Sequence, residues 1–129
     1  MAYQSSIILS KLENNDSFKN SQGKHECVEL VRGITNAPHT SLWRRSKRKV
    51  LEYQNNEILP GTPIATFDNK GQYPLDGVKH AAIYLSHDPT GIIVYDQWNN
   101  QGKVKKRKIH NRKFITRNVN DANAYYVIE

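Results

Sequence analysis

Three side chains of this 129-residue sequence are of the types that together perform nucleophilic acyl chemistry: Cys27, His80 and Asp96. In such chemistry a thiolate attacks a carbonyl carbon, an imidazole carries the proton, and a carboxylate orients the imidazole and stabilises its charged form. Cys27 is the one cysteine of the chain, so an intramolecular disulfide is excluded and the thiol either packs or reacts. A lone cysteine more often only packs, so these residue types suggest a cysteine hydrolase without establishing one.

The segment around Cys27 predicts a helix that would activate such a thiol. Within a helix predicted over 25–33, Cys27, Leu30, Val31 and Ile34 fall at i, i+3, i+4 and i+7 and form one apolar stripe. The cysteine then lies in the first turn and faces the core. The unpaired N–H groups and the dipole at that end of a helix stabilise a thiolate, and the same groups can stabilise an oxyanion.

His80 and Asp96 fall on two neighbouring strands of a predicted β-hairpin. The segments 80–85 and 92–98 predict strands, and the polar segment 86–91, which contains proline and glycine, predicts the turn between them. Two alanines follow His80, so a helix can approach this strand closely.

The register of this hairpin decides which side chain supports the histidine. If Leu85 pairs with Gly91, His80 lies opposite Asp96 on one face. A slip of one residue sets Gln97 opposite His80 instead, and the sequence leaves this choice open. Asp96 is preferred because a carboxylate both orients the imidazole and stabilises its charged form.

The remaining segments complete a single domain over 1–129 of the α+β class, with N-terminal helices packed on an antiparallel sheet of about five to six strands. A polar loop is predicted over 13–23 and a second helix over 41–54. Further strands are predicted over 64–67, 104–109 and 124–128.

Charge and apolar patterning limit the classes of function. The net charge is +7, and the excess is concentrated in the basic runs 44–49 and 103–113, which either attract polyanions or form solvated faces. No apolar run approaches the roughly 20 residues that span a bilayer. The N-terminal segment 1–10 lacks the features of a Sec signal peptide, so the chain is expected to be made in the cytoplasm without one. The sequence contains no metal-binding motif, and no cofactor is predicted.

Five blocks of the sequence look like successive blocks of a known group of enzymes: Glu-Cys-Val-Glu-Leu-Val (26–31), Pro-Gly-Thr-Pro-Ile-Ala-Thr-Phe (60–67), Lys-His-Ala-Ala-Ile-Tyr-Leu (79–85), Val-Tyr-Asp-Gln-Trp (94–98) and the ending Ala-Tyr-Tyr-Val-Ile (124–128). They resemble the NlpC/P60 and CHAP group of papain-like cell-wall cysteine peptidases. The chain resembles in particular a small bacterial family of that type, which is associated with type VI secretion amidase effectors.

This resemblance implies a papain-like fold, in which a helix bearing the nucleophile packs on an antiparallel sheet bearing the base. It implies Cys27 as the nucleophile, His80 as general base and acid, and Asp96 as the orienting residue. It also implies hydrolysis of an amide bond in the peptidoglycan stem peptide or cross-link, in the periplasm of a target bacterium. The implied partners are a cognate immunity protein and a component of the secretion machine, without membrane insertion.

Two residues beside Asp96, Gln97 and Trp98, are predicted to contact substrate. Trp43 could line the same cleft, although a tryptophan is more often part of the core.

Two other hypotheses remain open. A papain-like site can instead deamidate a protein target or transfer acyl groups to it. The basic runs could also belong to a non-catalytic nucleic-acid-binding or adaptor domain, but they lack the interleaved aromatic residues that stack on bases, so nucleic acid is not the expected partner.

Overall fold

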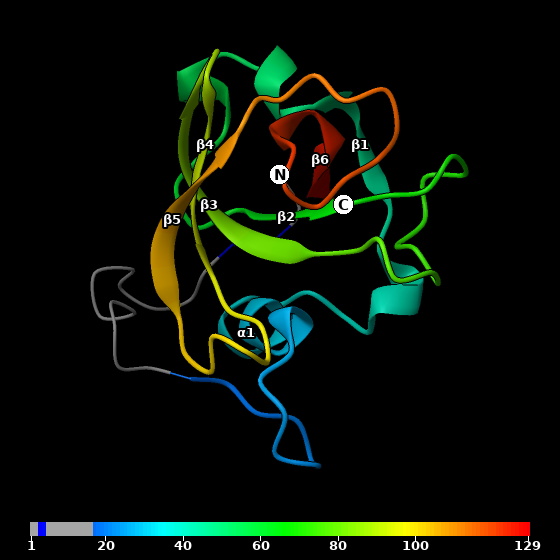
Figure 1. The fold of residues 1–129 in the computed structure, drawn as a ribbon, viewed down its shortest axis with the longest axis vertical. Coiled ribbons are helices and arrows are strands. Elements are labelled where there is room, and N and C mark those ends of the chain that lie inside the picture. The colour runs from blue at the N-terminus through cyan, green and yellow to red at the C-terminus, as the bar shows by residue number, and fades with distance from the viewer. Residues whose placement is uncertain (1–2, 5–16) are drawn as a thin grey trace.

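The computed structural model describes residues 3–4 and 17–129, and its main element is a six-stranded antiparallel sheet with the spatial order β1-β6-β2-β3-β4-β5 (Figure 1). The described residues contain one α-helix, α1 (Cys27–Ile34), which packs against β3. The strands are β1 (Arg45–Lys49), β2 (Pro63–Thr66), β3 (Ala81–Asp88), β4 (Gly91–Asp96), β5 (Lys105–His110) and β6 (Tyr125–Ile128), and short 3₁₀ turns cover Thr40–Leu42, Val50–Glu52, Asn55–Glu57 and Ala122–Ala124.

The predicted antiparallel sheet of five to six strands is confirmed, but the described residues contain one helix instead of the several N-terminal helices expected for the α+β class. No helix in the described part of the chain is long and apolar enough to cross a membrane. The prediction that segment 1–10 is not a Sec signal peptide concerns residues that lie mostly outside the described part of the chain. The first part of the loop predicted over 13–23 also lies outside it.

The helix predicted around Cys27 is present because its apolar stripe is buried. Leu30, Val31 and Ile34 are at most 1% exposed and pack in one cluster with Ala81 of β3. A second apolar cluster covers the other face of the sheet, so the sheet separates two cores. The side of the sheet that carries α1 is the side on which Cys27 lies.

The helix predicted over 41–54 is wrong, because this segment forms the edge strand β1 followed by a 3₁₀ turn. β1 pairs with the C-terminal strand, with Arg45 opposite Ile128. The buried hydroxyl of Ser46 accepts a hydrogen bond from the Val127 N–H at 3.1 Å. These partners are about 80 residues away in the sequence, so a local helical pattern could not reveal them, and tertiary pairing overrides local preference here.

The two basic runs contribute β1 and β5, which are the two edge strands of the sheet. Lysine and arginine on an edge strand oppose pairing with another chain. The basic residues of both strands therefore suit protection of the sheet edges.

The register predicted for the β3–β4 hairpin is also wrong. Gly91 pairs with Asp88 instead of Leu85, so β3 runs further than expected, and a bulge lies between Tyr84 and Ser86. The polar residues that suggested a long turn remain in the ladder, because pairing with β4 satisfies their backbone groups. The register matters for the site, because both His80 and Asp96 lie at the far end of this hairpin.

Candidate active site

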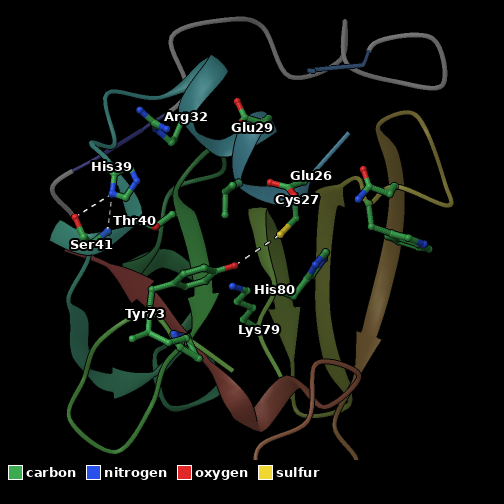
Figure 2. Close-up of a pocket in the computed structure, with 15 residues that line it drawn as sticks. Glu26, Cys27, Glu29, Arg32, His39, Thr40, Ser41, Tyr73, Lys79 and His80 are labelled. Atoms are coloured by element: carbon green, nitrogen blue, oxygen red, sulfur yellow. Dashed lines mark hydrogen bonds between the residues drawn. The ribbon is translucent and has the colours of Figure 1, made fainter. Parts of the chain in front are cut away.

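A cavity of about 490 Å³ lies where the N-terminus of α1 meets the start of β3, and Cys27 and His80 both line it (Figure 2). Tyr73 and Trp98 contribute aromatic walls. The cavity also contains charged side chains of α1 and of the segment before β3: Glu26, Glu29, Arg32 and Lys79. A concave site with a few convergent polar groups is the usual form of a small-molecule or peptide binding site.

Cys27 is the first residue of α1, and the extended backbone of Glu26 leads into it. The N–H groups of a first helical turn have no partner within the helix, so they point their partial positive charge toward the cysteine side of the cavity. Cys27 is half-buried, and its Sγ lies 3.7 Å from the hydroxyl of Tyr73. This environment favours a thiolate over a thiol.

His80 immediately precedes β3, and Asp96 is the last residue of β4. His80 Nε2 lies 2.7 Å from Asp96 Oδ2, and both side chains are buried, with Asp96 fully so. An ionised carboxylate only accepts hydrogen bonds, so Nε2 is the donor and Nδ1 is the ring nitrogen left for the thiol of Cys27. The contact is present even though the register that suggested it was wrong.

The electrostatics of the pair favour a thiolate and an imidazolium. Burial opposes ionisation of Cys27, but the hydrogen bond and the charge of His80 outweigh it and lower the pKa of the thiol. Burial likewise opposes the charged form of His80, but the hydrogen bond to Asp96 and the interaction with Cys27 raise its pKa from 6.5 to about 9. Such displaced values are common at catalytic sites.

These shifts predict a window of activity that extends into the alkaline range. Because the pKa of Cys27 is lowered and that of His80 is raised to about 9, the ion pair persists up to about pH 9. We expect kcat/KM for a substrate attacked by Cys27 to stay level through neutral pH and to fall with an apparent pKa of about 9. The stability contributed by the raised pKa of His80 is fully present below about pH 6.5 and is lost as the pH rises through 9. An alkaline limb near 6.5 in a pH–rate profile would contradict this assignment.

Tyr73 is a site residue that the sequence did not reveal. Its hydroxyl faces Cys27 Sγ (Figure 2), and its ring packs edge-on against Trp43 at 4.9 Å between centroids. Burial, reinforced by the negative charge of Cys27, raises the pKa of Tyr73 far above its ordinary value, so the hydroxyl stays protonated and can donate to the thiolate. A tyrosine in an irregular loop has no periodicity that would mark it.

Gln97 and Trp98 have different positions although they are adjacent. Trp98 lines the cavity, as predicted for a substrate contact, and its ring meets that of His80 edge-on at 6.3 Å. Gln97 is fully buried and is not among the residues that line the cavity, so its predicted contact with substrate finds no support in its position. Trp43 is fully buried and belongs to the core.

The amide of Gln97 instead holds the segment that precedes Cys27. Its Nε2 donates to the carbonyls of Phe18, at 2.7 Å, and Glu26, at 2.9 Å, and its Oε1 accepts from the Phe18 N–H at 3.0 Å. The ring of Phe18 lies so close to Gly33 that a Cβ there would come within 2.6 Å of it. Gln97 therefore orients the entry into α1 and does not support His80.

In the described part of the chain, no three His, Cys, Asp or Glu side chains are grouped closely enough to hold a metal ion.

Comparison with known proteins identifies related chains. Residues 3–128 match the model of a family described as domesticated amidase effector 2. The chain is 36% identical over 117 residues to a type VI secretion amidase effector 2 protein of Salmonella typhi, covering 81% of this chain and 85% of that protein. It is 38% identical over 109 residues to the domesticated amidase effector 2 of Ixodes scapularis, covering 82% of this chain and 72% of that protein.

A solved structure has the same fold. It is of a type 6 secretion amidase effector 2 and superposes with a TM-score of 0.79 at 32% sequence identity, covering 97% of this chain and 93% of the other.

Proposed function

Because this chain belongs to the domesticated amidase effector 2 family, we propose that it is a papain-like cysteine amidase that cleaves an amide bond in the stem peptide or cross-link of peptidoglycan. The observation that carries the proposal is the position of Cys27 at the N-terminus of α1, in one cavity with a His80 that is bonded to a buried Asp96. The extent of the catalytic domain, residues 1–129, stays a prediction.

In the proposed reaction the thiolate of Cys27 attacks the carbonyl carbon of the scissile amide. The N–H groups of the first turn of α1 stabilise the oxyanion that forms. The imidazolium of His80 then gives a proton to the departing amine, the carbon–nitrogen bond breaks, and a thioester to Cys27 remains.

Water completes the proposed cycle. His80, now neutral, takes a proton from a water molecule as the water attacks the thioester carbonyl. The carbon–sulfur bond breaks, which releases a carboxylic acid and restores the thiolate and the imidazolium. Asp96 keeps the ring oriented through both halves of the cycle, because its bond to Nε2 leaves Nδ1 toward the sulfur.

The charges of the cavity support a peptide that carries charges of its own. Glu26, Glu29, Arg32 and Lys79 line the cavity, and none of them forms an ion pair within the described residues. Stem peptides of peptidoglycan contain free carboxylates, which Arg32 and Lys79 can bind, and amino groups, which the two glutamates can bind. The geometry thus suits a short charged peptide better than an apolar ligand.

Reversing a cation of the cavity is expected to weaken substrate binding more than catalysis. Lys79→Glu and Arg32→Glu should each raise KM for muropeptide substrates about tenfold with a much smaller change in kcat, because these side chains contact neither Cys27 nor the reacting bond directly. Steady-state kinetics on a purified muropeptide give both constants. Lys47→Glu on exposed β1 removes the same charge away from the cavity, and an equal rise in KM there would show that only net charge matters.

The proposed activity is tested by mass spectrometry of purified peptidoglycan after incubation with the protein. We expect shorter muropeptides whose summed masses exceed the parent by one water. Replacement of an amide nitrogen by oxygen in an added protein, without new muropeptides, would favour the deamidase hypothesis instead.

The biological setting follows from the family and stays part of the proposal. We expect an antibacterial effector that acts in the periplasm of a target cell and that is neutralised by a cognate immunity protein in the producing cell. Expression with an export signal should then lyse a host bacterium, whereas cytoplasmic expression should be harmless. Lysis from the cytoplasm would argue against peptidoglycan as the target.

A further inference from the structure

A cation from the edge strand β5 reaches into the candidate site. Arg107 Nε donates a hydrogen bond to Asp96 Oδ2 at 2.7 Å, the same oxygen that accepts from His80 Nε2 at 2.7 Å. The other oxygen, Asp96 Oδ1, is buried and accepts no hydrogen bond from the described residues. One carboxylate oxygen thus links the imidazole on one side to a guanidinium on the other.

The charges of these groups balance only when the arginine is included. With a thiolate at Cys27 and an imidazolium at His80, the carboxylate of Asp96 leaves the buried site with a net charge of −1. Arg107 brings this sum to zero. Burying a charge without a partner costs free energy. The positive charge of Arg107 therefore lowers the free-energy cost of ionising Cys27, His80 and Asp96 together.

The same guanidinium also contacts Trp98, which forms an aromatic wall of the cavity. Its carbon atom lies 5.0 Å from the centre of the Trp98 ring, and Trp98 meets His80 edge-on. The side chain of Arg107 is 27% exposed. It contacts Asp96 through a hydrogen bond and Trp98 through its ring face.

We propose that Arg107 is a positioning residue that fixes the carboxylate of Asp96 and neutralises its charge, so that the thiolate of Cys27 and the imidazolium of His80 can form together. The proposal deepens the proposed function and rests on it for the role of Cys27. It also separates Arg107 from the neighbouring cations Lys105 and Lys106 of β5, which are exposed.

Thiolate formation at Cys27 is the direct readout, because alkylation by iodoacetamide needs no peptidoglycan. The other charged or titratable side chains that line the cavity are Glu26, Glu29, Arg32, His39 and Lys79, and all of them are present in every variant. Tyr73 and Tyr125, whose pKa values are strongly raised, stay neutral across the experiment. For Arg107→Met we expect the midpoint of the alkylation rate against pH to move upward by about one unit, which is about a tenfold slower reaction on the acid limb.

Matched variants separate this role from a general effect of charge or folding. Lys106→Met removes the same charge from an exposed neighbouring position of β5 and should leave the profile unchanged. Arg107→Lys, which keeps the charge, should recover more than half of the shift. Arg107→Gln, which removes the charge but keeps a polar side chain, is the fallback if Arg107→Met does not fold. In an Asp96→Asn background, Arg107→Met should have little further effect, because the arginine acts through the carboxylate.

Three results would overturn the proposal: no shift in folded Arg107→Met or Arg107→Gln protein, an equal shift in Lys106→Met, or an undiminished shift in the Asp96→Asn background. Each of these leaves peptidoglycan hydrolysis by the wild-type protein untouched. Conversely, Arg107→Met could shift the alkylation midpoint although the wild-type protein does not cleave peptidoglycan. That result would sustain the role of Arg107 and refute the proposed substrate. The two proposals can therefore fail separately.

Discussion

Replacing Cys27 by alanine is expected to lower amide hydrolysis by at least about 10³-fold, because the variant has no atom that can form the acyl intermediate. The fold should remain intact. Cys27 is only half-buried, and its loss removes one sulfur from the rim of a cavity, whereas Leu30, Val31 and Ile34 still anchor α1. The measurement is the rate of release of new muropeptides, taken together with the thermal unfolding midpoint.

Serine at position 27 gives a stricter version of this experiment. A hydroxyl is close in size to the thiol but does not ionise in this range, so activity should stay as low as in Cys27→Ala. Without the thiolate, the raised pKa of His80 should also fall, because Cys27 contributes to that shift. Lys47→Ala, at an exposed position of β1, is the control: it is prepared in the same way and should leave activity unchanged. Activity that survives both changes at Cys27 would refute the nucleophile.

Replacing Asp96 by asparagine should lower kcat by two to four orders of magnitude. The asparagine amide can present its NH₂ to His80 and favour the wrong tautomer, and a comparable change in another protease with such a triad has an effect on the order of 10⁴. Since Asp96 also raises the pKa of His80, the alkaline limb of the pH–rate profile should move from about 9 toward 6.5. The change of pH profile is what distinguishes loss of an orienting carboxylate from simple destabilisation.

Gln97→Ala is the informative comparison for Asp96→Asn. Gln97 contacts the backbone of Phe18 and Glu26 and not the imidazole, so its loss should loosen the segment before Cys27 and lower the unfolding midpoint. The alkaline limb near pH 9 should remain in place. If Gln97→Ala moved that limb and Asp96→Asn did not, the assignment of the third residue would have to be exchanged.

Local sequence was sufficient to predict α1 and the position of Cys27 in it. The apolar stripe has helical spacing, and a helix satisfies its own backbone hydrogen bonds, so no distant partner is needed. The same holds in part for β2, β3, β4, β5 and β6, whose residues have the composition of strands. Segment 41–54 shows the limit of such patterns: its apolar residues are spaced two turns apart, yet it forms β1 because β6, at the other end of the chain, offers an unpaired edge.

The site depends on the tertiary structure to a greater degree. Residue types and order were enough to nominate Cys27, His80 and Asp96, but the expected register was wrong, and the contact forms because His80 lies just before β3 and its ring reaches Asp96. Tyr73 comes from a loop without periodicity, and Arg107 is one of several cations in a basic run. No local sequence pattern therefore marks either residue as part of the site.

The sequence by itself determined which short segments bury an apolar face and which residue could be the nucleophile, because both depend on periodicity over about ten residues. The tertiary structure alone decided which carboxylate meets His80, which tyrosine meets the thiol, and which of many cations neutralises Asp96. Those contacts join residues 11 to 46 positions apart. They arise from strand register and loop closure, which are set by the packing of the whole sheet and not by any local preference.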